Sequence, residues 1–313
     1  MPVVSATQRA ILEAARFLEG GGVISFPTET VYGLGGDTLN KKAIQKIYSL
    51  KNRPSNNPLI AHVLNSSWAK QITCGWDEKC HLLAERFWPG PLTIVLPKAN
   101  CVPKESCGGH NTIGVRSPNH KVARELLDKF GGPISAPSAN KSGQTSPTSA
   151  EHVRDDFGND LLILDGGNCD QGIESTVLSM VDCPTILRLG SIDVSAISEI
   201  VHTVVVSESN FQTDSPGTTN RHYSPKTKLV LQSPREIEAS SSKEIVYLTI
   251  VSQPGCSMKT IQMPTDAQSY ANRLYAAMRE ADSVGSTTIC VERPPIGNEW
   301  DAINDRLRRA SSN

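Results

Sequence analysis

The sequence predicts an α/β protein with a mixed sheet, followed by a linker and a second, smaller α/β domain. Helix and strand patterns alternate through roughly the first 200 residues. Residues 204–227 are then rich in Ser, Thr and Pro and show weak periodicity, and strand and helix patterns resume after them. Because 313 residues are too many for one small core, we expect domains at 1–203 and 229–313 joined by a linker over 204–228.

The first domain begins with a predicted helix near 6–19, because its apolar residues recur along one face. A second helix, near 39–50, ends before Pro54, which blocks its continuation. Asn119 is the expected N-cap of a helix near 120–129. The remaining predicted elements are a helix at 77–87 and strands at 23–26, 59–63, 92–96, 113–116, 134–136, 161–164, 175–180 and 185–189.

The second domain repeats this alternation on a smaller scale. Short apolar runs predict its strands, and longer amphipathic stretches predict its helices. The strands are expected at 229–231, 245–251, 260–263 and 287–291, and the helices at 266–281 and 298–310.

Composition and charge exclude several classes of protein. The hydrophobic content of 38% and charged content of 20% fit a soluble globular protein, and the net charge of −1 gives no global attraction to nucleic acid or membrane. No segment approaches the length of a membrane span, and the N-terminus has no apolar signal core. The eight cysteines form no C-x-x-C pair, so we expect reduced thiols and a cytoplasmic location.

Two segments together predict a polyphosphate site. Lys51 and Arg53 can lie side by side with no carboxylate beside them, and they precede a strand. Residues 133–143 supply small polar side chains, namely Ser135, Ser138, Asn140 and Ser142. Two cations facing hydroxyls and an amide suit a bound polyphosphate. Taken alone, however, the cations are better explained as charges at a helix C-terminus, where they complement the helix dipole.

Other polar side chains occur at predicted strand ends, where ligands of α/β folds gather. Residues 27–37, PTETVYGLGGD, are either a ligand-binding loop or an ordinary strand-to-helix loop. His62 is either a ligand contact or a satisfied structural group. Arg116 can hold a carboxylate through two parallel hydrogen bonds, or it is a surface residue. Residues 172–177, GIESTV, form a strand entry or a plain turn, and Arg188 is a phosphate contact or a sheet-edge charge.

The usual catalytic motifs are missing. The chain has no G-x-x-x-x-G-K-[ST], no correctly spaced G-x-G-x-x-G, no H-E-x-x-H and no G-x-S-x-G. These absences argue against a P-loop hydrolase, a zinc protease and a serine hydrolase. The strand-end residues instead indicate a polar, anionic ligand, such as a nucleotide together with a small carboxylate.

Six motifs in fixed order resemble the YrdC-like family of threonylcarbamoyl-AMP synthases, over about residues 21–190. They are PTETVYGLGGD, KNRPSNNPLI, FWPGPLTIVL, GVRSPNH, SAPSANKSG and GIESTV. SPGTTNRHYSP at 215–225 is similar to the linker of the two-domain members, although 218–220 depart from the family pattern. The resemblance implies an open twisted mixed sheet with helices and a smaller Rossmann-like C-terminal domain.

The resemblance also implies an activity. The enzyme would be a nucleotidyltransferase that makes threonylcarbamoyl-AMP and pyrophosphate from L-threonine, bicarbonate and ATP, with Mg²⁺ held through the ATP phosphates and by no residue. The product would pass to tRNA threonylcarbamoyl-transfer proteins. Tyr223 in the linker would close the site as part of a lid.

The resemblance assigns residues to two substrates. Those implied as catalytic are Lys51, Arg53, Ser138 and Asn140. Those implied to bind the nucleotide are Arg53, Asn57, Thr112, Ser138, Ser146, Arg188 and Tyr223. Those implied to line the threonine pocket are Thr30, His62, Arg116, Ala136 and Ser175, with Arg116 taking the carboxylate.

Two rival functions fit the chain less well. The YrdC-like domain also occurs in hydrogenase-maturation carbamoyltransferases, but this chain lacks their acylphosphatase-like and zinc-finger segments. A module that binds tRNA or double-stranded RNA is the rival from another class, and the near-neutral charge argues against it as the main role.

Overall fold

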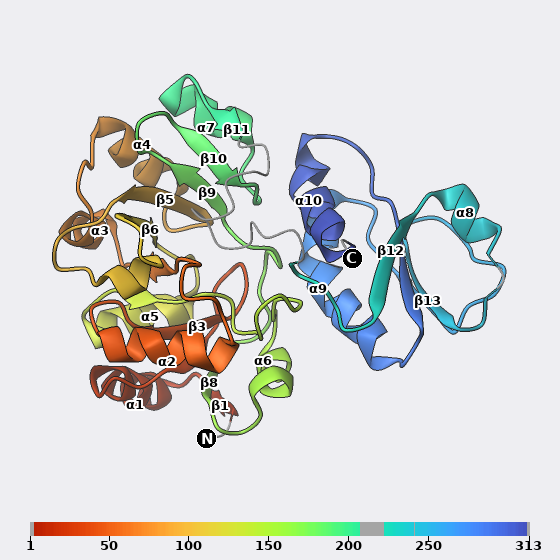
Figure 1. Cartoon of the computed structure of the whole chain (residues 1–313), viewed down its shortest axis with the longest axis horizontal. Helices are drawn as coiled ribbons and strands as arrows, with labels where there is room; N and C mark the ends of the chain where they lie inside the picture. Colours follow the sequence, from red (N-terminus) through yellow and green to blue (C-terminus); the bar gives the residue numbers. More distant parts are fainter. Residues whose placement is uncertain (1–2, 207–221, 241, 312–313) are drawn as a thin grey trace. The chain divides into compact units, whose positions relative to one another are not determined.

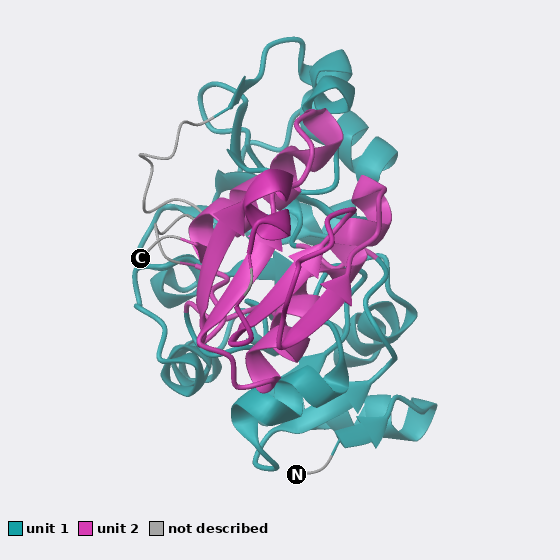
Figure 2. Ribbon diagram, turned by 90° about the vertical axis from the view of Figure 1, so that its right-hand side faces the viewer, with its two compact units in different colours: residues 1–142, 147–170, 174–218 teal, residues 143–146, 171–173, 219–313 magenta. Residues whose placement is uncertain are grey.

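A computed structural model describes residues 3–206, 222–240 and 242–311. The chain divides into two compact units (Figure 2). The first unit comprises residues 1–142, 147–170 and 174–218, and the second comprises 143–146, 171–173 and 219–313. The domain limits expected at 203 and 229 stay a prediction, and most of the predicted linker lies outside the described residues.

The first unit is built on a large mixed sheet (Figure 1). Its described strands lie in the order β1-β8-β2-β3-β7-β4-β6-β5-β9-β10-β11. Strand β6 pairs parallel with β4 and antiparallel with β5, so the predicted mixed α/β class is confirmed. The strands are β1 (Val3–Ser5), β2 (Ile24–Phe26), β3 (Gly33–Asp37), β4 (Ile60–His62), β5 (Leu92–Pro97), β6 (Thr112–Arg116), β7 (Ile134–Ser135), β8 (Leu162–Asp165), β9 (Thr176–Ser179), β10 (Thr185–Arg188) and β11 (Val205–Val206).

Helices of the first unit follow the local sequence signals. Helix α1 buries the predicted apolar stripe, which includes Ile11 and Leu18, and the Thr7 hydroxyl caps it by accepting from the Ala10 N–H at 3.2 Å. The helices are α1 (Gln8–Glu19), α2 (Lys41–Lys51), α3 (Ser66–Ile72), α4 (Glu78–Phe87), α5 (Lys121–Phe130), α6 (Ala150–Phe157) and α7 (Val194–Val201), with a 3₁₀ turn at Lys104–Cys107. The elements of this unit that were not predicted are β1, β3, β11, α3, α6, α7 and the 3₁₀ turn, and β11 lies within the segment predicted as a linker.

Two local predictions are wrong. The interpretation of 27–37 as a loop fails over Gly33–Asp37, which is strand β3. The glycines permit close packing there, because a Cβ on Gly35 would lie 2.6 Å from the Phe26 ring and 2.8 Å from Ile134. The N-cap of α5 is His120 rather than Asn119, since the His120 Nδ1 accepts from the Val122 N–H at 3.2 Å.

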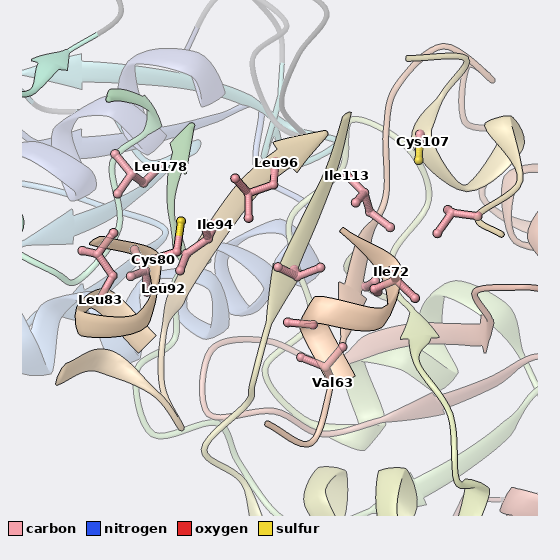
Figure 3. Packing of buried hydrophobic residues seen from close by; sticks show 14 of the residues in the cluster. Val63, Ile72, Cys80, Leu83, Leu92, Ile94, Leu96, Cys107, Ile113 and Leu178 are labelled. Atoms are coloured by element: carbon pink, nitrogen blue, oxygen red, sulfur yellow. The ribbon is translucent and has the colours of Figure 1, made fainter. Parts of the chain in front are cut away.

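A hydrophobic core supports the strands that carry the site. Leu92, Ile94 and Leu96 of β5 and Ile113 of β6 are buried in one cluster with Leu178 of β9 (Figure 3). Successive side chains of a strand point to opposite faces, so the residues between these apolar ones face the other side of the sheet. Packing on one face thereby fixes where Thr93 and Arg116 project.

The second unit is a smaller α/β structure with a parallel sheet in the order β12-β15-β13-β14. The Glu292 carboxylate at the end of β15 accepts hydrogen bonds from the backbone N–H groups of Ile250, Val251 and Ser252, at 2.7–3.1 Å. The elements are β12 (Lys228–Gln232), α8 (Pro234–Glu238), β13 (Ile245–Thr249), β14 (Lys259–Gln262), α9 (Ala267–Ser283), β15 (Thr288–Glu292), a 3₁₀ turn (Asn298–Trp300) and α10 (Asp301–Ala310).

None of the described helices combines the length and the apolar character that a membrane crossing requires. All eight cysteines lie in the described part of the chain, and each is a free thiol. Within the same residues, no cluster of three or more His, Cys, Asp or Glu side chains is arranged to hold a metal ion.

Candidate active site

Lys51 joins the two segments that were predicted to form a polyphosphate site. Helix α2 ends at Lys51 because Asn52 takes the left-handed conformation, with φ of 52°. The buried Lys51 ammonium donates to the Ser138 carbonyl at 2.5 Å, the Asn140 carbonyl at 2.5 Å and the Asn140 Oδ1 at 3.3 Å. These contacts match its three N–H donors. Burial, and then the charge of Arg53, hold the pKa of Lys51 well below its ordinary value.

Arg53 organises the loop that follows α2. Its Nε donates to the Asn57 carbonyl at 3.1 Å, and its Nη2 donates to the Asn57 Oδ1 at 2.5 Å and the Pro58 carbonyl at 3.0 Å. Tyr48 also donates to the Asn57 carbonyl, at 3.0 Å. Arg53 and Asn57, both implied to bind the nucleotide, are therefore in direct contact just before β4.

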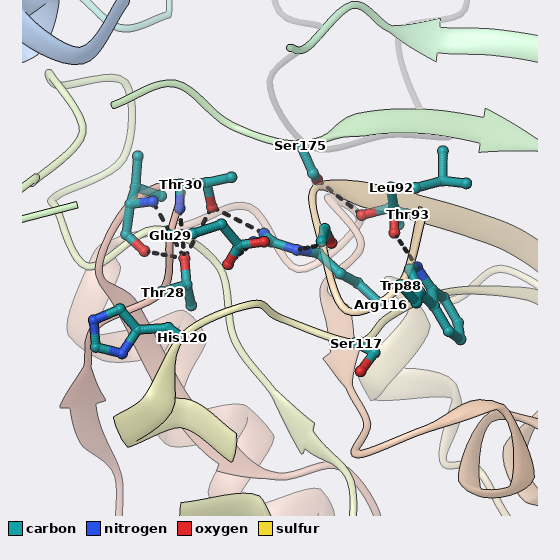
Figure 4. A network of polar contacts seen from close by, with 12 residues as sticks. Thr28, Glu29, Thr30, Trp88, Leu92, Thr93, Arg116, Ser117, His120 and Ser175 are labelled. Atoms are coloured by element: carbon teal, nitrogen blue, oxygen red, sulfur yellow. Dashed lines mark hydrogen bonds and ion pairs between the residues drawn. The ribbon is translucent and has the colours of Figure 1, made fainter. Parts of the chain in front are cut away.

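Arg116 ends strand β6 and is buried with three partners (Figure 4). Its Nη1 donates to the Thr30 Oγ1 at 2.9 Å, and its Nε donates to the Gly90 carbonyl at 3.3 Å. Its Nη2 lies 2.7 Å from the Glu29 Oε2 in an ion pair whose side chains are each 4% exposed. The interpretation of Arg116 as a surface residue is thereby excluded.

Glu29 is the residue that sequence reasoning missed. In the sequence, Glu29 is only one of several polar residues in the PTET segment at 27–30. The one available signal was its position, because it follows β2 by two intervening residues and a carboxylate so close to a buried strand needs a partner. That partner, Arg116, is 87 positions away, and pattern reading of one sequence does not pair residues at that distance.

His62 lies on β4 opposite Arg116 of β6 in the strand register. Burial, and then the Arg116 charge, lower the pKa of His62 to about 3. The imidazole is therefore neutral at physiological pH. Its Nδ1 has no hydrogen-bond partner among the described residues.

The pKa of His62 gives a pH-dependent stability. In the unfolded chain, His62 has a pKa of 6.5 and binds a proton below that pH. In the native state it stays neutral down to about pH 3, so the free energy of unfolding falls as the pH falls from 6.5. Between pH 7 and pH 5 we expect the wild type to lose about 2 kcal/mol more than His62→Gln, which cannot titrate. Urea unfolding at both pH values measures the difference, and an identical pH dependence of the two proteins would exclude this contribution of His62.

Ser175, Thr93 and Arg188 form a second polar cluster at the start of β9. The Ser175 and Thr93 hydroxyls lie 2.8 Å apart, and Arg188 donates to the Ser175 carbonyl and hydroxyl, each at 3.0 Å. Thr93 belongs to β5, which pairs with β6. The structure thus brings Arg188, predicted for the nucleotide, against Ser175, predicted for the threonine pocket.

Gly190 allows the backbone to approach this cluster closely. A Cβ there would collide with the Thr176 amide nitrogen and would lie 2.6 Å from the Ser175 carbonyl carbon. We expect Gly190→Ala to destabilise the protein by about 1–3 kcal/mol and to displace Ser175. Gly20→Ala is the control, because its new Cβ would meet only ordinary contacts, the nearest at 3.5 Å. Thermal melting measures both, and equal melting temperatures would show that the 174–176 segment moves freely.

Other predicted site residues, namely Thr112, Ala136, Ser146 and Tyr223, lie outside the clusters around Lys51, Arg116 and Ser175. Thr112 begins β6 and Arg116 ends it, so they are about 13 Å apart along the strand. The Ala136 N–H donates to the Ile60 carbonyl of β4 at 2.9 Å. Ser146 and Tyr223 fall in the second unit, where the Tyr223 carbonyl accepts from the Thr145 hydroxyl at 3.5 Å.

Comparison with known proteins identifies relatives of nearly the whole chain. The family profile described as "Telomere recombination" matches residues 16–190, and the one described as "Threonylcarbamoyl-AMP synthase, C-terminal domain" matches residues 192–312. The threonylcarbamoyl-AMP synthase of Pyrococcus abyssi is 36% identical over 95% of this chain and 93% of its own length. The chain belongs to the threonylcarbamoyl-AMP synthase family. The Bacillus subtilis member is also 36% identical, over 98% of this chain and 94% of its own.

Solved structures agree with this family assignment. The crystal structure of Pyrococcus abyssi Sua5 complexed with L-threonine has a TM-score of 0.92 and 35% identity, and covers 97% of this chain and 95% of that one. Escherichia coli YciO matches with a TM-score of 0.55 and 26% identity over 61% of this chain. The fold of this threonylcarbamoyl-AMP synthase family member therefore matches Sua5 across both units.

Proposed function

We propose that this protein is a nucleotidyltransferase that makes threonylcarbamoyl-AMP and pyrophosphate from L-threonine, bicarbonate and ATP. The observation that carries the proposal is the buried Arg116, held by Thr30 beside His62, since a buried guanidinium at a strand end suits an amino-acid carboxylate. The Sua5 relative that binds L-threonine is 35% identical and aligns with nearly the whole chain.

The proposed chemistry needs positive charge rather than a covalent nucleophile. Threonine condenses with bicarbonate to give a carbamate and water, and a carbamate oxygen then attacks the α-phosphorus of ATP while pyrophosphate leaves. Both reactants are anions, so cations must neutralise the charge that develops on the departing pyrophosphate. Mg²⁺ would enter as part of the substrate, bound to the ATP phosphates. Carbamates are short-lived in water, so a closed pocket would protect the intermediate.

We assign Lys51 and Arg53 a role behind the loops that would meet the nucleotide. Each holds its loop by backbone contacts, so the groups offered to the phosphates would be Asn57, Ser138 and Asn140, with both positive charges close behind. Further proposed nucleotide contacts are Thr112, Ser146, Arg188 and Tyr223. The threonine pocket would be lined by Thr30, His62, Arg116, Ala136 and Ser175.

Pyrophosphate exchange tests the proposal. Labelled pyrophosphate should enter ATP only when L-threonine and bicarbonate are both present, because the adenylate forms reversibly from all three substrates. A salt-titrated RNA-binding assay run in parallel tests the rival function. Tight, salt-sensitive RNA binding without exchange would overturn the enzyme proposal in favour of an RNA-binding module.

The same proposal indicates which proteins use the product and in which compartment. Its product would be consumed by proteins that transfer the threonylcarbamoyl group to tRNA, which we place in the cytoplasm. The eight free thiols suit a reducing compartment.

A further inference from the structure

Among the described residues, neither Glu29 carboxylate oxygen has a hydrogen bond, and only one of the two takes part in an ion pair. Glu29 is 3% exposed, and its Oε2 is engaged by Arg116 at 2.7 Å. Its Oε1 is buried and has no hydrogen-bond partner among the described residues. A buried carboxylate oxygen without a donor is costly, so such a group usually meets its donor in a ligand or a water molecule.

The backbone around Glu29 holds that oxygen in place. The Thr28 hydroxyl donates to the Val31 carbonyl at 2.7 Å and accepts from the N–H groups of Thr30 and Val31 at 3.2 and 3.3 Å. These three bonds close a turn around residue 29. Thr30 also accepts from Arg116, so the turn and the guanidinium form one rigid unit (Figure 4). The carboxylate is therefore fixed before any ligand arrives.

The charges of this unit match a zwitterion. Arg116 and Glu29 cancel one another, so a plain carboxylate ligand on Arg116 would leave an excess negative charge in a buried place. L-Threonine carries both a carboxylate and an α-ammonium group, so it adds no net charge. The neighbouring His62 also has an unpartnered nitrogen, but its low pKa keeps it neutral, and it offers no charge to an ammonium group.

We propose that Glu29 determines specificity for the amino acid by accepting a hydrogen bond from the α-ammonium group of L-threonine at Oε1, while Arg116 receives the carboxylate. The inference rests on the proposed function, because it takes threonine as the ligand of this pocket. It explains why an acid stands beside the arginine that binds an anion: the pair selects a ligand that bears both charges.

Binding calorimetry on the full chain tests the inference without requiring turnover. The ligands are L-threonine, 2,3-dihydroxybutanoate, which replaces the ammonium group by a hydroxyl, and threoninamide, which lacks the carboxylate charge. Wild type should prefer threonine to the dihydroxy acid by about tenfold or more. Equal affinities in the wild type would overturn the inference whether or not any variant folds.

Glu29→Gln is nearly isosteric and removes only the charge. It should lose about tenfold or more in threonine affinity while its affinity for the dihydroxy acid stays within about twofold. Arg116→Gln should show the reciprocal pattern, losing the carboxylate-bearing ligands and sparing threoninamide. Glu105→Gln is the matched control, because Glu105 pairs with the exposed Lys41 on the surface, and it should bind all three ligands as the wild type does.

Two results with Glu29→Gln would also overturn the inference. If Glu29→Gln weakens threonine and the dihydroxy acid equally, Glu29 serves only to hold Arg116. If it leaves threonine affinity unchanged, Oε1 does not meet the ammonium group. Failure of the wild type itself to bind threonine would instead overturn the proposed function, and this inference with it.

Discussion

Replacing Arg116 by methionine should lower the free energy of unfolding by about 3–5 kcal/mol, because it leaves the buried Glu29 carboxylate without its counter-charge. The two side chains are each 4% exposed, so water cannot compensate for the loss. The same substitution should raise the threonine requirement of synthesis by more than tenfold, since the carboxylate loses its guanidinium. Urea unfolding and the threonine dependence of pyrophosphate exchange measure the two effects separately.

The double variant Arg116→Met with Glu29→Met separates the ion pair from the packing. Replacing both members of a buried pair by apolar residues is often close to neutral, so the double variant should recover most of the stability that the single variant loses. It should not recover threonine use. If the double variant is as unstable as the single one, the loss comes from packing around Thr30 and Gly90 rather than from an uncompensated charge.

Replacing Lys51 by methionine should cost about 2 kcal/mol of stability, because the half-buried Ser138 carbonyl and the buried Asn140 carbonyl each lose the hydrogen bond that the Lys51 ammonium donates. The side chains of the same loop that we propose to contact the nucleotide would then lose their fixed positions. We therefore expect ATP use to weaken by more than tenfold, while threonine binding is affected much less. Urea unfolding and the ATP dependence of exchange are the measurements.

Lys141→Met is the matched control for Lys51→Met. Lys141 stands in the same loop and also donates to a backbone carbonyl, that of Leu50 at 2.8 Å, but its contact is exposed. It should lose little stability and little activity. Equal effects of the two variants would show that loss of a lysine charge near the loop, rather than loss of the Lys51 clamp, impairs the enzyme.

The fold class could be predicted because local patterns determine it. Alternating helix and strand periods predicted the mixed sheet of the first unit and a second, smaller α/β unit, and the spacing of apolar residues predicted the buried face of α1. Short or polar elements could not be predicted. Strand β3 has three glycines in five residues, which favour a loop on propensity alone, and only the packing of Phe26 and Ile134 against Gly35 explains why it pairs.

The grouping of some candidate site residues could be predicted, and their individual contacts could not. The sequence identified Lys51, Ser138 and Asn140 as one group, and the structure joins them by hydrogen bonds. The sequence did not show that the Lys51 ammonium donates its hydrogen bonds to Ser138 and Asn140 rather than facing solvent or a ligand. That arrangement depends on how the end of α2 packs against Ser138 and Asn140, about 90 positions later in the chain. Patterns of neighbouring residues do not predict contacts over that distance.

Mass spectrometry of the reaction products tests the central claim most directly. Purified protein incubated with L-threonine, bicarbonate, ATP and Mg²⁺ should yield threonylcarbamoyl-AMP together with pyrophosphate, and isotopically labelled bicarbonate should place its carbon in the carbamoyl group. Omitting threonine, bicarbonate or ATP should each abolish the product. Release of AMP and pyrophosphate without any threonylcarbamoyl-AMP, or formation of threonyl-AMP that lacks the labelled carbon, would contradict the account.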